Sequence, residues 1–423
     1  MSPVPPQITV VGRRLFPEDH RLRDFLTRAA QPFEWLEAGT PAAQEALEPH
    51  GAAGLELPVV IADDEVVAPA TVERLAEHWH LNAPPSRRLY DLAIVGAGPA
   101  GLAASVYAAS DGLSTIVLEE DLPGGQASHT SLIENFFGFP DGIGGAELAR
   151  LAGRQAEGFG VELILLRGVT GSHRHGGPDD PFTIEVAGGS EIEAQAVVAA
   201  PGMTWRRLDV EGIDELLERG VYYGAGRSEA AQCSGDDVVV VGAGNSAGQA
   251  VMHLGNSGAR VTMVVRGDRV GKSMSAYLID RIERHPLIEV RLRTEVEAVH
   301  PEDGHLAGVT LRDGGGGTQR LPATALFLCL GGQPRTAWAA ETSVQLDPAG
   351  FILTGPDLLD KGRRPDDWPL ARDPLALETG VPGIFAAGDV RHGSTKRVAG
   401  AVGDGAMATA LVHRRLDELM LGT

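Results

Sequence analysis

Cysteine is scarce in this chain of 423 residues, which contains two, Cys233 and Cys329. Two cysteines cannot build a scaffold of several disulfides, and so low a content fits a reducing cytoplasm, where we expect the protein to reside. The 13 histidines show no spacing typical of metal ligands. We therefore expect neither a disulfide framework nor a metal site.

Basic residues and long apolar runs are also lacking. Lysine and arginine total 36 against 57 aspartates and glutamates, and the net charge of −21 argues against binding to nucleic acid or to anionic membranes. No apolar run reaches the roughly 20 residues that span a bilayer. The first residues, MSPVPPQITV, lack the basic start and the apolar stretch of a signal peptide. These absences leave a cytosolic enzyme as the broad expectation.

The length allows two to four domains, and the pattern of the first 83 residues predicts a small one. Apolar residues at helical spacing (Leu22, Phe25, Leu26 and Ala29) follow a short apolar strand. The predicted elements are a strand at 8–12, a helix at 20–30, a strand at 33–38, a hairpin at 55–67 with Asp63-Asp64 in its turn, and a helix at 71–81. The proline-rich stretch NAPPSRR predicts a boundary, with a linker at 84–88.

This order of strands and helices at residues 1–83 resembles a glutaredoxin- or thioredoxin-like domain. In that family a proline, usually cis, precedes the central strand, and Leu57-Pro58 looks like it. The family's active-site cysteines would lie near residues 17–20, where this chain has none. A copy without cysteines cannot exchange thiols, and we interpret it as a docking or dimerisation module.

A glycine-rich turn follows an apolar strand near residue 95. Gly96, Gly98 and Gly101 form G-x-G-x-x-G before a helix of small residues. The first glycine permits a tight turn, the second lets the backbone approach a pyrophosphate, and the third lets helix and strand pack closely. Glu119 closes the next strand, where a carboxylate accepts hydrogen bonds from ribose hydroxyls. The pattern predicts a site for FAD or NAD, with a purely structural loop as the lesser alternative.

A second unit of the same plan, at 238–265, contains Gly242, Gly244 and Ala247 as G-x-G-x-x-A. Its second strand ends at Arg266, with Arg269 and Lys272 close behind, rather than in an acid. A cation there can pair with a ribose 2′-phosphate, which favours NADPH over NADH. The alternative is that these are ordinary solvated charges.

Two further stretches predict contacts with a flavin. The first, GGQASHTSLIENFFGFP (124–140), is richer in glycine and amide residues than a plain connection needs. In the second, 381–413, Asp389 follows a strand and can bond the hydroxyls of a ribityl chain. A helix beginning near residues 396–398 can direct its backbone amides at the N1/O2 edge of the flavin ring.

Together, residues 89–420 resemble the low-molecular-weight thioredoxin reductases, within the pyridine nucleotide–disulfide oxidoreductases. The motifs that occur in the family's order are VGAGPAG, GGQ, ENFFGFP, AAPG, YY, VGAGNSA, the Gly331-Gly332 segment and FAAGDV. The resemblance implies an α/β fold with two Rossmann-like domains, in which an NADPH domain (209–333) is inserted in an FAD domain (89–208 and 334–423). It also implies a homodimer.

The resemblance further implies which residues hold the two cofactors. Those for FAD would be Gly96, Gly98, Pro99, Ala100, Gly101, Glu119, Gly125, Gln126, Asn135, Gly388, Asp389, Lys396, Arg397 and Val398. Those for NADPH would be Gly244, Asn245, Ser246, Ala247 and Arg266.

Both redox cysteines of that family are missing. Where the family has Cys-Ala-Thr-Cys after a similar pair of tyrosines, this chain has GAGR at 224–227. Cys233 lies six residues further on, and we interpret it as inert, with a peroxide-sensing or mixed-disulfide thiol as the alternative. Cys329 lies in the apolar run ALFLCLGG, where cysteine acts as a small apolar residue. A polar insertion at 355–372 has no counterpart in the minimal enzymes, and we interpret it as a partner or dimer loop.

The sequence thus predicts an NADPH-dependent FAD oxidoreductase without a catalytic side chain. Electrons would pass from NADPH through FAD to a ferredoxin, another flavin, a quinone or oxygen. A thioredoxin-disulfide reductase that uses other thiols is one alternative. A flavin- and NADPH-binding redox sensor or scaffold is the other.

Overall fold

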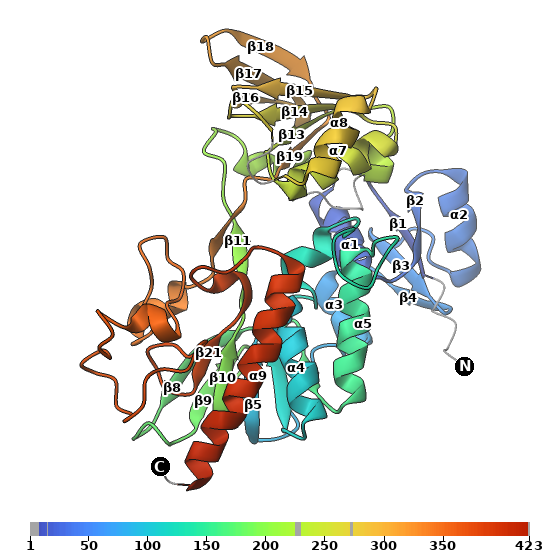
Figure 1. Ribbon diagram of the computed structural model, residues 1–423. Coiled ribbons are helices and arrows are strands. Elements are labelled where there is room, and N and C mark those ends of the chain that lie inside the picture. Colours follow the sequence, from blue (N-terminus) through green and yellow to red (C-terminus); the bar gives the residue numbers. More distant parts are fainter. Residues whose placement is uncertain (1–7, 15, 225–229, 271–273, 422–423) are drawn as a thin grey trace. The chain divides into compact units, whose positions relative to one another are not determined.

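The computed structural model describes residues 8–14, 16–224, 230–270 and 274–421. The chain divides into two compact units (Figure 1). The first unit comprises Met1–Trp79, His129–Leu132 and Trp205–Gly331, and the second comprises His80–Ser128, Ile133–Thr204 and Gly332–Thr423.

The N-terminal part of the first unit is a separate small α/β sheet. Its strands have the order β2-β1-β3-β4, with β1 parallel to β2 and antiparallel to β3. The elements are β1 (Ile8–Gly12), α1 (Pro17–Arg28), β2 (Phe33–Glu37), α2 (Pro41–Leu47), β3 (Val59–Ala62), β4 (Glu65–Val67) and α3 (Val72–His78). The Leu57–Pro58 peptide is cis, as expected, and Asp63 and Asp64 form the hairpin turn with positive φ angles of 47° and 70°.

The rest of the first unit is built on a five-stranded sheet. Its strands run in the order β12-β19-β13-β14-β15, and every adjacent pair is parallel. The sheet's strands are β12 (Val221–Tyr223), β13 (Asp237–Val241), β14 (Arg260–Val265), β15 (Ile288–Leu292) and β19 (Ala325–Leu328), and its helices are α7 (Asn245–Asn256) and α8 (Ala276–Arg284). A three-stranded antiparallel sheet adds β16 (Thr294–Glu302), β17 (His305–Asp313) and β18 (Thr318–Pro322).

The second unit contains a seven-stranded mixed sheet in the order β7-β6-β5-β10-β9-β8, with β21 paired to β10. Its strands are β5 (Leu89–Val95), β6 (Thr115–Leu118), β7 (Glu162–Ile164), β8 (Val169–Arg174), β9 (Phe182–Val186), β10 (Ser190–Ala199) and β21 (Ile384–Ala386). Its helices are α4 (Pro99–Ser110), α5 (Gly145–Gly158) and α9 (Val398–Leu421). A further pair of strands joins β11 (Met203–Trp205) to β20 (Gly332–Pro334).

Close packing of α4 against α9 sets the core of the second unit (Figure 1). A Cβ atom added to Gly405 would lie 2.1 Å from the backbone oxygen of Ala100, so the two helices touch through their backbones there. The Thr409 hydroxyl donates a 3.1 Å hydrogen bond to the Ala104 carbonyl. Small residues on both helices therefore hold the start of α9 near the first glycine turn.

The expected α/β architecture is confirmed. One helix beside the small N-terminal sheet, α2, was not predicted from the sequence. Helix α2 is short, and its only buried residue, Ala43, gave no helical periodicity to detect. The N-terminal residues are a separate α/β sheet, while their thioredoxin-like identity stays a prediction. Among the described residues, no helix is long and apolar enough to span a membrane.

Candidate nucleotide-binding sites

The first glycine turn joins β5 to α4 and leaves no room for side chains at two of its glycines. Gly96 has a φ of +102°, and a Cβ there would lie 2.3 Å from the Ala200 carbonyl oxygen. A Cβ on Gly101 would lie 1.9 Å from the Gly96 carbonyl oxygen. Both positions therefore require glycine for backbone packing, as the sequence pattern predicts.

The middle glycine of this turn faces open space. Gly98 is the N-cap of α4, and a Cβ there would meet no heavy atom within 4 Å. The N–H groups of the first helical turn have no partner inside the helix, and they attract an anion. Pro99 and Ala100 continue the turn into α4. The room beside Gly98 and these donors fit the pyrophosphate of a dinucleotide.

Glu119 lies at the end of β6, beside the same turn. One carboxylate oxygen accepts a 2.6 Å hydrogen bond from the Ala97 N–H, and the other accepts from the Asp121 N–H at 2.9 Å. Burial raises the pKa of this carboxyl, and the two backbone donors oppose that rise. The lone pairs that remain can accept hydrogen bonds from ribose hydroxyls.

Gly125 and Gln126 lie in a short 3-10 helix (Gly125–His129) that returns to the first turn. The Gly124 N–H donates to the Ala97 carbonyl at 2.7 Å, and a Cβ on Gly125 would lie 3.5 Å from the Gly98 Cα. The Gln126 side-chain amide donates to the Met203 carbonyl at 3.0 Å. Asn135 lies further along, in the loop closed by the bridge between Ile133 and Ile143.

Asp389 follows β21 and lies in the 3-10 turn Gly388–Val390, before α9. A Cβ on Gly388 would lie 2.9 Å from the Ala100 Cβ, which places this turn beside the start of α4. Burial raises the pKa of the Asp389 carboxyl, and the charge of Lys396 opposes the rise. A carboxylate deprived of water in this way gains from hydroxyl donors, and the ribityl chain of a flavin would supply them.

Lys396 and Arg397 precede α9, which begins at Val398. The Lys396 ammonium donates to the Asp389 carbonyl at 2.5 Å and to the Ser394 hydroxyl at 2.6 Å. It also lies 4.2 Å from the centre of the Phe351 ring. Burial lowers the pKa of Lys396, and the opposite charge of Asp389 only partly offsets this decrease. These contacts fold the segment back onto Asp389, so the predicted flavin-binding residues of this stretch lie together.

Sequence reasoning missed Asp404, which anchors this turn from within α9. Its carboxylate accepts hydrogen bonds from the Gly388 N–H at 3.1 Å and from the Arg391 Nε at 3.2 Å. The His392 Nδ1 lies 2.6 Å from Asp347, on the other side of the loop. No pattern in the sequence pairs Asp404 with Gly388 or Arg391, because the contact depends on how α9 packs.

The second glycine turn, in the first unit, repeats the plan between β13 and α7. Gly242 has a φ of +150°, and a Cβ there would lie 2.5 Å from the Cys329 carbonyl oxygen. Gly244 is the N-cap of α7, and Ala247 is fully buried behind the turn. The Asn245 side-chain oxygen accepts a 2.7 Å hydrogen bond from the Ser275 N–H. Asn245 thus ties the turn to the start of α8, and Ser246 follows it.

The cations predicted to select NADPH follow β14. Arg266 and Arg269 are exposed there, which fits both a contact with a phosphate and the alternative of ordinary solvated charges, so the choice of NADPH stays a prediction. Lys272 lies outside the described residues.

Comparison with known proteins decides the family. The sequence matches the pyridine nucleotide-disulphide oxidoreductases over residues 90–405. The chain belongs to this family. A thioredoxin reductase of Bacillus subtilis is 31% identical over 78% of this chain and 96% of its own length, and one of Treponema pallidum is 33% identical over 78% and 98%.

Solved structures agree with the sequence relatives. A thioredoxin reductase of Lactococcus lactis has a TM-score of 0.68 at 29% identity and covers 78% of this chain and 99% of its own. A thioredoxin reductase of T. acidophilum gives the same TM-score at 27% identity, with the same coverage. This pyridine nucleotide-disulphide oxidoreductase therefore has a thioredoxin reductase fold and an N-terminal extension in front of the matched region.

The two cysteines of this oxidoreductase are both buried, and neither forms a disulfide. Cys233 is 4% exposed and Cys329 is 7% exposed, in the same hydrophobic cluster. Burial raises the pKa of the Cys329 thiol to about 12, so a thiolate does not form there at neutral pH.

Gly224 marks the place where the thioredoxin reductases that the chain resembles have their first redox cysteine. It has a φ of +84°, and a Cβ there would lie 3.2 Å from the ring of Trp205. Residues 225–227, which complete the replaced motif, lie outside the described residues. A side chain at the first position would therefore need both a strained backbone and a shift of the Trp205 ring.

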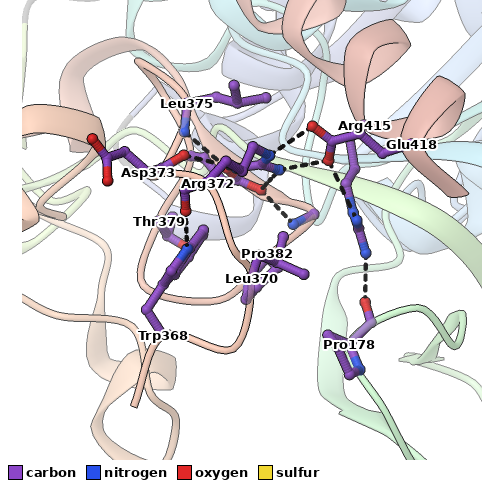
Figure 2. Close-up of polar contacts among 12 residues, drawn as sticks. Pro178, Trp368, Leu370, Arg372, Asp373, Leu375, Thr379, Pro382, Arg415 and Glu418 are labelled. Atoms are coloured by element: carbon purple, nitrogen blue, oxygen red, sulfur yellow. Dashed lines mark hydrogen bonds and ion pairs between the residues drawn. The ribbon is translucent and has the colours of Figure 1, made fainter. Parts of the chain in front are cut away.

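The insertion at 355–372 is tied to the end of α9 at its last residue (Figure 2). The Arg372 guanidinium pairs with Glu378 at 2.6 Å and with Glu418 at 2.6 Å. The Trp368 ring nitrogen donates to the Arg372 carbonyl at 2.7 Å. Residues between Gly362 and Asp373 line a cavity of about 690 Å³. The role of this insertion as a partner or dimer loop stays a prediction.

Proposed function

We propose that this protein is an NADPH-dependent FAD oxidoreductase that passes electrons to an acceptor other than a disulfide, such as a ferredoxin, another flavin, a quinone or oxygen. The family consists of FAD-dependent NAD(P)H oxidoreductases. The observation that carries the proposal is that the only two cysteines of the sequence are buried in one hydrophobic cluster. Disulfide exchange needs an accessible thiolate, and burial opposes its formation.

In this proposal the second unit holds FAD and the first holds NADPH. The open space at Gly98, the buried carboxylate of Glu119, the half-buried carboxylate of Asp389 and the N-terminus of α9 would bind the pyrophosphate, ribose, ribityl chain and ring of FAD. Arg266 would pair with the 2′-phosphate of NADPH. Bound FAD supplies hydride acceptance from the nicotinamide, and the residues of the chain supply position and electrostatics. The homodimer, the domain boundaries and the cytoplasmic location predicted from the sequence belong to the same proposal.

An anaerobic titration of the purified FAD-loaded protein with NADPH tests the proposal. We expect the flavin absorbance to bleach fully after two electrons per FAD, because flavin would be the only redox centre. The Cys233→Ser/Cys329→Ala double variant is the matched control and should take up the same number.

Two other results would contradict the proposal and point elsewhere. An uptake of four electrons that falls to two in the double variant would show a usable disulfide, and with it a thiol-based reductase. A flavin that neither NADPH nor NADH bleaches would favour a cofactor-binding sensor or scaffold.

A further inference from the structure

The N-terminal sheet contacts the rest of the first unit through the start of α1, and the contact has complementary charges. The Arg14 guanidinium pairs with Asp236 at 2.7 Å, and the Arg21 guanidinium pairs with Glu218 at 2.8 Å. Asp236 also accepts a 3.0 Å hydrogen bond from the Thr324 hydroxyl, which fixes its carboxylate. Two basic residues of the small sheet thus meet two acidic residues that flank β12 and β13.

A ring contact accompanies these two ion pairs. The His20 ring lies 4.9 Å from the Tyr222 ring, centre to centre, and Tyr222 stacks in turn on Phe327 at 5.4 Å. His20 is buried, with 9% of its surface exposed. The contact therefore combines one buried ring with two ion pairs.

On both sides of this contact lie positions at which the families that the chain resembles carry redox cysteines and this chain has none. His20 belongs to residues 17–20, where a thioredoxin-like domain would carry its cysteines. Tyr222 lies two residues before Gly224, where the replaced dithiol of the reductase would begin. The two vacated positions are therefore brought to one interface.

We propose that the N-terminal domain is a resident, redox-silent occupant of the face that a thioredoxin-fold partner would use. The face is formed by Glu218, Tyr222 and Asp236, and its occupant is this chain's own α1 with Arg14, His20 and Arg21. Because domain and face belong to one chain, the tether gives an effective concentration on the order of millimolar, so a small interface is enough. The face is thereby closed to external thiol partners, and an electron acceptor approaches the flavin elsewhere.

The inference rests on the proposed loss of thiol exchange, but its test needs no turnover. In the full-length protein, Arg21→Cys/Glu218→Cys places two surface thiols across the contact, where a short bismaleimide can join them. The matched control is Glu45→Cys/Glu218→Cys, since Glu45 is exposed on α2, beyond β2 and away from α1 (Figure 1). We expect rapid cross-linking within single chains for the first pair and little for the control. Equal rates for both pairs, or none for the first, would overturn the inference, whatever the NADPH titration shows.

A charge reversal gives a second measurement. Arg14→Glu/Arg21→Glu replaces both attractions by repulsions, and we expect deuterium exchange of the backbone at residues 216–224 to rise at least about tenfold. Adding Glu218→Arg and Asp236→Arg should restore the wild-type exchange. Unchanged exchange in the first variant would also overturn the inference.

Discussion

Replacing Arg372 by methionine will destabilise the second unit by about 3–5 kcal/mol, the usual result of breaking a buried ion pair from one side. The guanidinium makes two bonds to Glu378, at 2.6 and 3.1 Å, and two to Glu418, at 2.6 and 2.9 Å. Figure 2 shows it between the loop before β21 and the end of α9. Burial alone would lower the pKa of Arg372, but its bonds to both carboxylates raise that pKa on balance.

The magnitude depends on Glu378, whose side chain is fully buried. Without Arg372, its carboxylate keeps the N–H groups of Leu375 at 2.9 Å and Gly383 at 3.0 Å, but it loses the only cation that pairs with it among the described residues. Glu418 is 19% exposed and can turn to water, so its share is smaller, about 1 kcal/mol. The cost therefore comes mainly from one buried, uncompensated charge.

Urea unfolding followed by circular dichroism and tryptophan fluorescence measures this cost. The control Glu418→Gln should lose about 1 kcal/mol. The double variant Arg372→Met/Glu378→Gln should recover part of the loss, because it leaves no buried charge behind and keeps a side-chain oxygen that can accept from the N–H group of Leu375 or Gly383. A loss below about 1 kcal/mol for Arg372→Met, or a double variant as unstable as the single one, would refute the reasoning.

Three further predictions concern the cofactor sites. Gly101→Ala should lower the free energy of unfolding by about 1–3 kcal/mol in urea titrations because of backbone overlap, whereas Gly98→Ala should keep the fold and lower the FAD content of the purified protein. Arg266→Ala should weaken NADPH binding about 10- to 100-fold in fluorescence titrations and leave NADH binding nearly unchanged; equal losses would contradict a phosphate contact. Asp389→Asn should weaken FAD binding but raise the free energy of unfolding of the apoprotein at neutral pH, because burial raises the pKa of Asp389 and so disfavours its charged form. This gain in stability should vanish as the pH falls below the ordinary aspartate range. A gain that persists in acid would refute the prediction.

The sequence was sufficient for features that depend on local spacing. Gly96 and Gly101 fall in a strand–turn–helix pattern whose backbone geometry requires glycine, so their positions could be predicted without a structure. The burial of Cys329 was also predictable, because it lies in an apolar run that reads as a buried strand.

Features that join distant segments could not be predicted in this way. Arg372 and Glu418 are 46 residues apart, and Asp404 reaches Gly388 across the loop before α9. Arg372 and Glu418 are charged residues in polar stretches, and Asp404 is a lone carboxylate in an apolar one. Only the packing of α9 gives each of them a charged partner and leaves it partly shielded from solvent. Helix α2 was missed for a related reason, since one buried alanine carries too little periodicity.

The packing around Cys329 indicates that this cysteine cannot replace the missing dithiol. The Cys329 carbonyl lies behind Gly242, so close that any side chain on that glycine would overlap it. Cys329 therefore packs behind the second glycine turn, and a movement that exposed its thiol would disturb the turn that we propose binds NADPH. The same residue thus cannot serve as a thiol donor while the turn is intact, which agrees with the direct transfer from the flavin that we propose.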